Sequence, residues 1–461
     1  MDTRRSVNME ADSGRQTGRV ERRLDLRNQL ISSLDGFRTT LGSFRGVHRD
    51  SLMTNSFFLA SNTVTMGVSG FVFWILAARL FHPGALGLAT TVITAAGLIS
   101  FIGQCGFNTT FVAVLPTATE TNVIMNTGTL VTFCAAGLVA AGYAGVVPVF
   151  APRLEFLRSD MWYFLAFVLF TGFIAVNSVT DSVFIAFRFA KYNLLIDGFI
   201  QGVTKLLFLV AVVSMGAIGI FLSYGAGAFI AVAVSLGLMA RLFGYRPRLR
   251  LTLRPMAGVL HYSAVNYVAN VLTFVPTFLV PLLILSGLGA ASVGFFYVSL
   301  QVVTMLYGAE GALALSLFAE GSQRDANVRR LAIRTGVALV GVIVPGIAVM
   351  AGGSAVILGV FGPTYRQRAT ALLVVLAIGA IPVALNLWTT CLLRLRKQLG
   401  AVVMTSAIFA AGVCVPAAWW RHRPLVWVGV AWLIGYALSG LAGVLALKYL
   451  PRTRGSSTAK I

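Results

Sequence analysis

Residues Asn193–Val213 read NLLIDGFIQGVTKLLFLVAVV. The stretch is long and apolar enough to cross a membrane as a helix. It nevertheless carries Asp197 and Lys205, although an ionised group at bilayer depth costs about 2.5–3.5 kcal/mol even on insertion-based scales. Similar runs recur along the 461 residues, of which 57% are hydrophobic and 11% charged. Soluble domains carry about 25% charged residues, so the sequence predicts an all-α polytopic membrane protein.

The hydropathy pattern predicts twelve transmembrane helices. Their approximate ranges are 54–78, 86–114, 122–148, 161–187, 194–215, 217–240, 259–285, 291–318, 331–357, 369–393, 400–420 and 425–448. An even number of spans places both termini on one side of the membrane.

The distribution of basic residues predicts the orientation. The net charge is +21 and the chain holds 36 Lys and Arg residues. Lys205 lies within the membrane. The basic residues on the side opposite the termini are Arg79, Arg153, Arg158, Arg366, Arg368, Arg421 and Arg423, and the others lie on the side of the termini. The positive-inside rule then predicts cytoplasmic termini. The Arg-rich, Ala/Gly-rich composition favours a bacterial plasma membrane, and membrane topology explains the charge without a nucleic-acid partner.

The segment RLFGYRPRLRLTLRP (Arg241–Pro255) is the longest connection and divides the chain into two halves. We expect a basic cytosolic tail over 1–50, disordered or amphipathic, a six-helix bundle over 51–243, a linker over 244–257, a second six-helix bundle over 258–450 and a tail over 451–461. All predicted loops are short, which leaves no room for a soluble catalytic domain.

The two halves resemble one another. PGALGLATTVI (Pro83–Ile93) matches the pattern of AASVGFFYVSL (Ala290–Leu300), and AVNSVTD (Ala175–Asp181) matches ALNLWTT (Ala384–Thr390) at nearly the same spacing. FAPR (Phe150–Arg153) likewise matches FGPT (Phe361–Thr364). Because the copies are six spans apart, they share one orientation. This predicts two bundles related by a parallel pseudo-twofold repeat, a transporter design in which the substrate lies between the halves.

The segment AARLFHPGALGLATTVITAAGLISFIGQCGFNT (Ala77–Thr109) resembles the opening of the multidrug/oligosaccharidyl-lipid/polysaccharide (MOP) flippase superfamily. VFGPTYRQRATALLVVLAIGAIPVALNLWTTCLLRLRK (Val360–Lys397) resembles its ninth and tenth spans. Twelve spans are similar to the Wzx-type polysaccharide flippases within that superfamily. The resemblance implies a cavity lined by the first, second, seventh and eighth spans.

Polar stripes lie on the spans that this resemblance places at the cavity. In the first span, Asn55, Asn62 and Ser69 recur every seven residues. Asn266 and Asn270 lie four residues apart in the seventh span, as do Tyr297 and Gln301 in the eighth. Such side chains suit sugar hydroxyl groups, so we expect them to bind substrate. Hydrogen bonding between helices is the alternative role.

The intramembrane charges are candidates for substrate binding, ion pairing or coupling. Asp197 and Lys205 lie two turns apart, about 12 Å of rise, which is too far for direct bonding. Lys205 therefore needs a partner on another helix. One alternative is a permanent pair with Asp181; the other is a cavity-facing Lys205 that pairs with Glu310 and attracts a lipid-linked pyrophosphate. Glu310 and Gln301 fall on opposite faces of a straight helix.

The sequence favours a flippase for a polyprenyl-pyrophosphate-linked oligosaccharide in cell-surface polysaccharide biosynthesis. Its expected partners are this substrate, membrane lipid and polysaccharide assembly proteins, and no cofactor or metal is expected. A cation-coupled multidrug antiporter of the same superfamily is the alternative. A membrane-embedded glycosyltransferase or polymerase is less favoured, because the histidines are scattered and no paired-carboxylate or nucleophile motif is found.

Overall fold

The computed structural model describes residues 54–55, 57–118, 120–248, 257–322 and 327–449. Residues 59–461 form one compact unit, which is described by itself, and residues 1–58 form another. The predicted tails over 1–50 and 451–461 and most of the linker lie outside the described residues.

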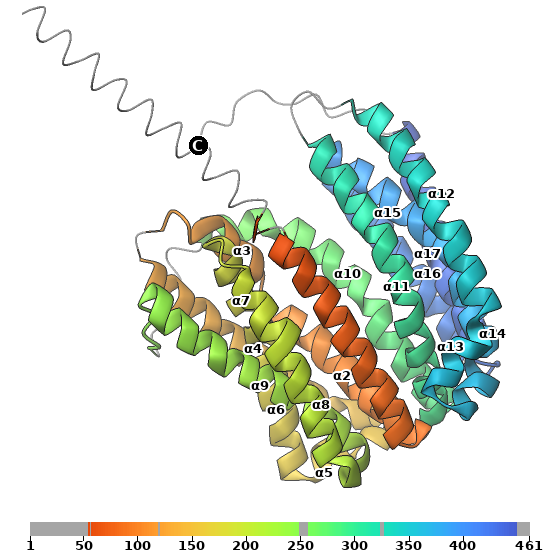
Figure 1. Cartoon of the computed structure of the whole chain (residues 1–461), viewed down its shortest axis with the longest axis horizontal. Helices are drawn as coiled ribbons and strands as arrows, with labels where there is room; N and C mark the ends of the chain where they lie inside the picture. Colours follow the sequence, from red (N-terminus) through yellow and green to blue (C-terminus); the bar gives the residue numbers. More distant parts are fainter. Residues whose placement is uncertain (1–53, 56, 119, 249–256, 323–326, 450–461) are drawn as a thin grey trace, which may run out of the picture. The chain divides into compact units, whose positions relative to one another are not determined.

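Within the described residues, twelve helices are long and apolar enough to cross a membrane, which confirms the predicted all-α, twelve-span fold. The N-terminal half contains the first span Phe57–Leu80, α2 (Pro83–Gly103), α3 (Phe107–Val114), α4 (Thr121–Phe150), α5 (Phe156–Ser159), α6 (Met161–Ala186), α7 (Lys191–Asn193), α8 (Gly202–Ala211) and α9 (Gly216–Phe243). The C-terminal half contains α10 (Ala257–Gly287), α11 (Ala290–Gly321), α12 (Val328–Gly352), α13 (Ser354–Phe361), α14 (Pro363–Ile378), α15 (Ala380–Leu395), α16 (Leu399–Trp419) and α17 (Val426–Tyr449) (Figure 1).

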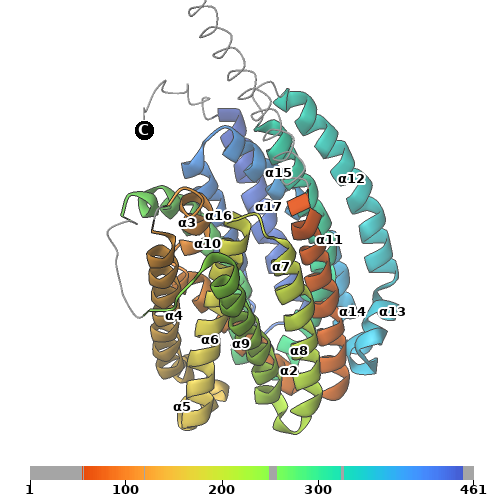
Figure 2. The same ribbon diagram turned by 60° about the vertical axis from the view of Figure 1, so that its left-hand side comes forward.

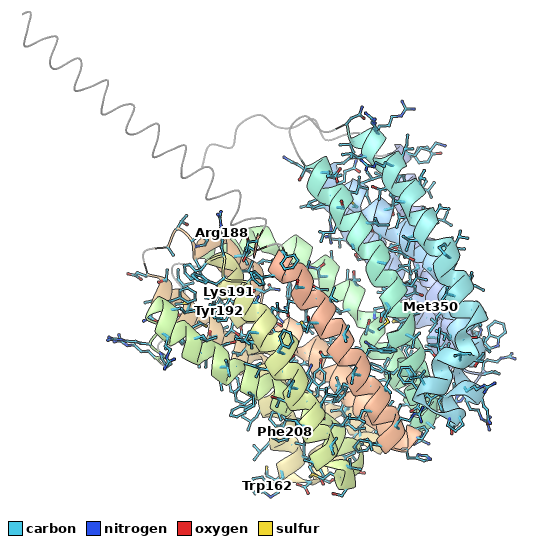
Figure 3. All side chains as sticks on the ribbon, viewed as in Figure 1. Trp162, Arg188, Lys191, Tyr192, Phe208 and Met350 are labelled. Atoms are coloured by element: carbon cyan, nitrogen blue, oxygen red, sulfur yellow. The ribbon has the colours of Figure 1, made fainter. Side chains whose placement is uncertain are left out.

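The turns between spans alternate between two sides. We call the side that carries residues 79–83, 151–160, 287–290 and 419–425 the outer side, after the predicted orientation, and the opposite side the inner side. In Figure 3, Trp162 marks the outer end of the N-terminal half, and Arg188 and Lys191 mark its inner end. The Trp420 and Trp427 rings, 5.0 Å apart, lie on the outer side, as is typical of the aromatic residues at a membrane interface.

Matching turns support the internal repeat. Helices α6 and α15 both end in a non-glycine residue with left-handed backbone, Arg188 (φ 62°) and Lys397 (φ 57°). In each turn the next residue donates its N–H to the carbonyl five residues before it, Phe189 to Phe184 at 2.7 Å and Gln398 to Leu393 at 3.0 Å. The repeated sequence therefore folds into the same helix-ending turn in both halves.

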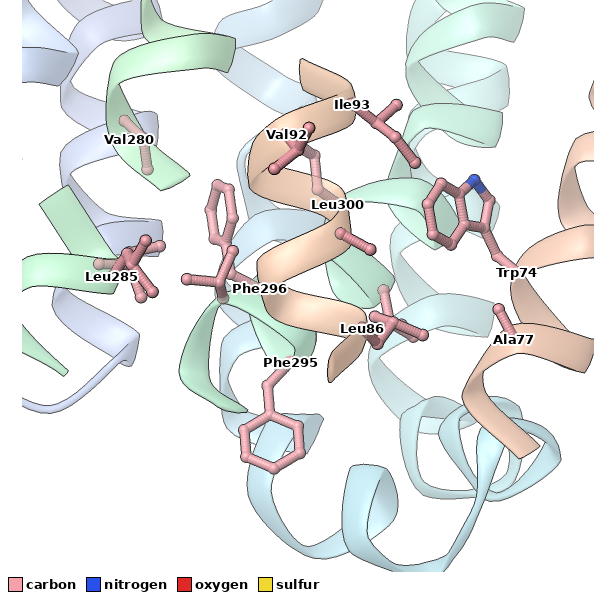
Figure 4. Close-up of a cluster of buried hydrophobic side chains, with 14 of the residues drawn as sticks. Trp74, Ala77, Leu86, Val92, Ile93, Val280, Leu285, Phe295, Phe296 and Leu300 are labelled. Carbon is pink, nitrogen blue, oxygen red and sulfur yellow. The ribbon is translucent and has the colours of Figure 1, made fainter. Parts of the chain in front are cut away.

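Helix α2 connects the halves. It packs against α4, α6 and α9 on one side and against α10 and α11 on the other (Figure 2). The largest buried cluster spans this junction, with Trp74 and Leu86 facing Phe296 and Leu300 across it (Figure 4). The two predicted bundles thus share one apolar junction at α2.

Three spans differ from the regular helices expected. The tenth is divided into α14 and α15 at Gly379. The second is interrupted between α2 and α3, where Cys105 (φ 48°) and Gly106 (φ 80°) adopt left-handed backbone. The sequence predicted one uninterrupted helix over 86–114, which is wrong at this point. The fifth span begins, after α7, with a π-helix, η2 (Leu194–Gln201), a wider turn that is frequent at functional sites.

Helix α17 packs closely through Gly435, Ser439 and Gly443, which recur every four residues. A side chain on Gly435 would overlap Val413 of α16, and one on Gly443 would overlap Thr389 of α15. Ser439, which lies between them, donates to the Thr405 carbonyl at 2.8 Å. This small-xxx-small pattern allows close approach of neighbouring helices.

Candidate functional site: two polar clusters behind a closed outer junction

The two halves are closed against each other on the outer side. A side-chain carbon on Gly87 of α2 would overlap the Ala290 carbonyl oxygen of α11, and one on Gly294 would approach the Pro83 carbonyl. Glycine at both positions allows the backbones to touch. In the first span, the outer residues Phe73 and Trp74 are 2% and 3% exposed.

The same helices are exposed towards the inner side. Val64 and Val68, on the inner part of the first span, are 66% and 59% exposed. In α11, Gly308, Ala309 and Leu315 are likewise exposed, whereas Glu310, Ala314 and Leu317 on its other face are buried. The first span and α11 are therefore closed against each other on the outer side and exposed towards the inner side, whereas α10 still contacts α2 there through Tyr267.

Two arginines cross the closed junction. Arg79, at the end of the first span, donates from Nε to the Val360 carbonyl at 2.8 Å and from a terminal nitrogen to Gly359 at 3.4 Å. Arg153, after α4, donates to the Leu285 carbonyl at 3.1 Å. All three carbonyls lie in the last turn of a helix, where a cation is favourable; the Gly359 carbonyl also accepts from the Gly362 N–H at 3.2 Å.

The π-helix lies against the first span. A side chain on Gly198 would approach Thr65, and one on Gly202 would approach Ser69. Asp197 and Gln201, within the same segment, are 2% and 8% exposed. The two glycines bring the helices together, and the polar side chains of the π-helix turn into the bundle.

An acidic cluster forms where the π-helix meets α6. The Asn177 amide nitrogen donates to Asp197 Oδ1 at 2.9 Å, and the carboxyl groups of Asp181 and Asp197 lie close enough to interact. Ionised carboxylates only accept hydrogen bonds, so the two groups can share a hydrogen bond only when one of them carries a proton. Each residue was a candidate, but their pairing was not predicted.

The same cluster contains oxygens without a hydrogen-bond partner among the described residues. They are the buried Oδ1 atoms of Asn177, Asp181 and Asn193. Asn193 itself donates to the Asp181 carbonyl at 3.2 Å. A buried acceptor left unpaired costs about 1–3 kcal/mol, so this arrangement is poorly suited to a purely structural role.

Lys205 makes neither of the expected ion pairs in this conformation. The only salt bridge within 4.0 Å among the described residues joins Arg158 and Glu155. The Lys205 ammonium instead lies over the Tyr224 ring, 4.8 Å from its centre, a cation–π contact worth about 0.5–2 kcal/mol. Asp197 is the acidic group that acts on it electrostatically.

Lys205 also lies close to the closed junction. The Tyr224 ring contacts Phe73 at 6.3 Å between centres, and Trp74, next in sequence, contacts Tyr297 of α11 at 4.6 Å. An aromatic series therefore leads from the ammonium to the opposite half.

A polar pocket of about 360 Å³ lies in the C-terminal half between α10, α11, α15, α16 and α17. Asn270, Asn386, Thr390, Ser406 and Ser439 contribute amides and hydroxyls, with Arg394 as the cation. The Asn386 amide donates to the Ser439 hydroxyl. No carboxylate is among the described residues that line this pocket, so it offers neutral hydrogen-bonding groups and one positive charge.

The repeat relates this pocket to the acidic cluster. Asn386 and Thr390 of ALNLWTT stand where Asn177 and Asp181 stand in AVNSVTD. The matched turns then place Ser406 at the position of Asp197. These equivalent positions therefore hold two carboxyl groups in the N-terminal half and two hydroxyl groups in the C-terminal half.

Glu310 lies apart from both Lys205 and Gln301. Its side chain is fully buried in α11, and neither carboxyl oxygen has a hydrogen-bond partner among the described residues. It interacts electrostatically with Tyr307 and Tyr436. Gln301 is partly exposed, so the uninterrupted α11 separates the two side chains.

The predicted stripes are distributed over several environments. Asn62 is partly buried, Ser69 faces Gly202 and donates to the Met66 carbonyl at 3.1 Å, and Asn270 lines the polar pocket. Asn55 belongs to the separate unit of residues 1–58. The Asn266 side chain lies outside the described residues.

Sequence reasoning missed two features. Arg394 was counted only as a basic residue at a span end, although ALNLWTT indicated the repeated site beside it. The interruption after α2 also escaped, although GQCG (Gly103–Gly106) contained its signal. There, Tyr267 of α10 donates to the Ile102 carbonyl at 2.8 Å, which supplies a partner for a backbone group near the interruption.

Neither a family model nor a curated protein sequence matches the chain. Solved structures are similar to it. A multidrug resistance MATE family transporter of the MOP superfamily in an inward-facing conformation has a TM-score of 0.66 and 11% identity, with 85% of this chain and 96% of that chain covered.

Two further structures give the same result. The lipid II flippase MurJ in an inward closed conformation has a TM-score of 0.71 and 11% identity, covering 86% of this chain and 88% of its own. A MOP superfamily transporter from Pyrococcus furiosus has a TM-score of 0.57 and 11% identity, covering 86% and 96%. The chain therefore has the fold of the MOP superfamily transporters.

Proposed function

We propose that the protein is a flippase that moves a polyprenyl-pyrophosphate-linked oligosaccharide from the inner to the outer leaflet of a bacterial plasma membrane. The polar pocket of the C-terminal half carries this proposal. Its amides and hydroxyls suit sugar hydroxyl groups, and Arg394 suits an anion. Transport of this kind needs a polar path for the head group while the lipid tail stays in the membrane, and it needs no covalent chemistry.

Lys205 is our candidate for the second pyrophosphate contact. Its partner in this conformation is the neutral Tyr224 ring, which a doubly charged phosphate group can replace with stronger charge-assisted hydrogen bonds. The head group would then move from Arg394 towards the closed junction, and opening of that junction would release it on the outer side.

The acidic cluster is our candidate for energy coupling. A proton shared between Asp181 and Asp197 can leave when the two carboxyl groups separate, and the unpaired oxygens beside them offer places for a cation. Because the π-helix that carries Asp197 touches the first span at Thr65, and the start of α8 touches it at Ser69, a change at this pair can displace a helix of the junction.

Reconstitution tests the flippase. The full chain in phospholipid vesicles is given a fluorescent polyprenyl-pyrophosphate-linked oligosaccharide, and its arrival in the opposite leaflet is followed by lectin binding. We expect the wild-type chain to transport the labelled lipid and the Lys205→Ala variant to transport it at least tenfold more slowly. Lys191→Ala is the control, because Lys191 lies over the Tyr192 ring at 5.1 Å, near the inner end of the same span. Wild-type rates in Lys205→Ala would refute the role of Lys205, and absence of lipid movement in the wild type would refute the flippase.

A cation-coupled multidrug antiporter is the second candidate, and the Asp181–Asp197 pair favours it, because membrane acids can bind coupling ions and cationic drugs. The same vesicles, loaded with a fluorescent organic cation under an imposed proton gradient, test this function. Gradient-driven cation movement without oligosaccharide transport would establish the antiporter in place of the flippase.

A further inference from the structure

A large apolar groove lies between the halves on the outer side. It has a volume of about 720 Å³ and is bounded by α2, α4 and α10. Ile99 of α2, Val146 of α4 and Leu282 of α10 are typical of its walls. A second depression of about 490 Å³ follows the other side of α10 and shares Leu279 and Leu283 with the first. The apolar surface therefore continues around α10.

The outer end of the groove is cationic. Arg421 lines it there, and the Arg421 backbone is in contact with Gly287, where any side chain would overlap its carbonyl oxygen. Arg421 Nε donates to His422 Nε2 at 3.1 Å. The Trp420–Trp427 pair beside it marks the depth of lipid head groups, so Arg421 lies where a lipid phosphate is found.

The length of the groove limits its occupant. On α10 the lining runs from Phe278 to Ser286, about 12 Å of helix rise. Half of the hydrocarbon core is about 15 Å thick. On α4 and the residue that follows it, the lining runs from Val139 to Ala151, about 18 Å of rise, so the α4 and α10 walls together match the length of one leaflet's acyl chain, and Ile102 of α2 lies at the inner end of the groove. A polyprenyl chain is much longer than this groove.

We propose that this groove binds an acyl chain of one outer-leaflet phospholipid whose phosphate is bound by Arg421. Because α2 and α4 form one wall and α10 the other, this lipid bridges both halves in the outward-closed conformation and is released when they separate. A ligand that binds one conformation better shifts the population towards it. Phospholipid occupancy thus favours the closed outer junction, whatever the transported cargo is.

Two glycines of α4 provide a matched test. An added side chain has open space at both Gly142 and Gly145, but only Gly142 lines the groove. Gly142→Phe fills the groove, and Gly145→Phe adds the same ring outside it. Arg421→Ala removes the cation, with Arg423→Ala as its control on the same loop. The full chain is extracted from vesicles of phosphatidylglycerol and phosphatidylethanolamine and analysed by native mass spectrometry.

We expect one retained phospholipid per wild-type chain, at least a fivefold loss in Gly142→Phe and Arg421→Ala, and wild-type retention in both controls. Equal retention in Gly142→Phe and Gly145→Phe overturns the proposal. Photocrosslinking of the wild-type chain keeps the test independent of how the variants fold. A phospholipid with a diazirine on its acyl chain should label Ile99 and Leu282, whereas labelling only by a polyprenyl phosphate probe would contradict the assignment.

Discussion

Arg79 and Val360 are joined across the outer junction, with the guanidinium Nε donating to the carbonyl oxygen at 2.8 Å. The partner bond joins Arg153 to Leu285 at 3.1 Å. In the internal repeat, the first span corresponds to α10, and the segment after α4 to that after α12. In one bond the first span donates to the segment after α12, and in the other the segment after α4 donates to α10. The two bonds are therefore equivalent under the repeat, with donor and acceptor elements exchanged, and they close the junction on both sides of the pseudo-twofold axis.

Removing these bonds should open the junction. A hydrogen bond to a charged group contributes about 1.5–3 kcal/mol, so we expect Arg79→Ala and Arg153→Ala each to raise the outward-open fraction about tenfold. Ala77, fully buried in the junction, is changed to Cys in a background without the four native cysteines. The rate of its reaction with an impermeant maleimide reports opening. Arg158→Ala, which loses only a surface pair with Glu155, should leave that rate unchanged.

Closure should depend on glycine at position 87. Gly87→Val would place a branched side chain against the Ala290 backbone, so the junction cannot close and transport should fall at least tenfold. Gly97→Val on the same helix meets nothing within 4 Å and should transport normally. Transport rates and the amounts of folded protein in the membrane are compared for both. Normal transport by Gly87→Val would show that this contact is not needed.

The response to a proton gradient should depend on the acidic pair. Asp197→Asn can keep the hydrogen bonds to Asn177 and Asp181 but cannot exchange a proton, so we expect downhill transport to continue without acceleration by the gradient. Glu155→Gln, an exposed change on the outer surface, should preserve the acceleration. If Asp197→Asn vesicles respond to the gradient as the wild type does, the pair carries no coupling proton.

Arg394 should contribute charge to head-group binding. We expect Arg394→Gln to weaken binding of a soluble oligosaccharide pyrophosphate about tenfold, or about 1.4 kcal/mol, as measured by calorimetry. Arg394→Lys keeps the charge and should recover most of the affinity, although it loses bidentate contact. Equal affinity in the wild type and Arg394→Gln would exclude Arg394 from the binding site.

The sequence predicted what local patterns determine. Apolar run length defined the twelve spans, and the motif shared by Asn177 and Asn386 identified the repeat. It did not predict the π-helix at Asp197 or the pairing of Asp181 with Asp197, because those depend on contact between helices. Spacing on an ideal α-helix placed Lys205 near Asp181 and Glu310, whereas tertiary packing puts its ammonium over Tyr224.

The shared turn at Arg188 and Lys397 has an evolutionary consequence. The equivalent positions of the two copies share an amide, Asn177 and Asn386, yet one copy holds two carboxyl groups where the other holds two hydroxyls. Under the proposed roles, one copy binds cargo and the other couples transport to an energy source. Substitutions around Ser406 can therefore change cargo preference without disturbing the titratable residues near Asp197.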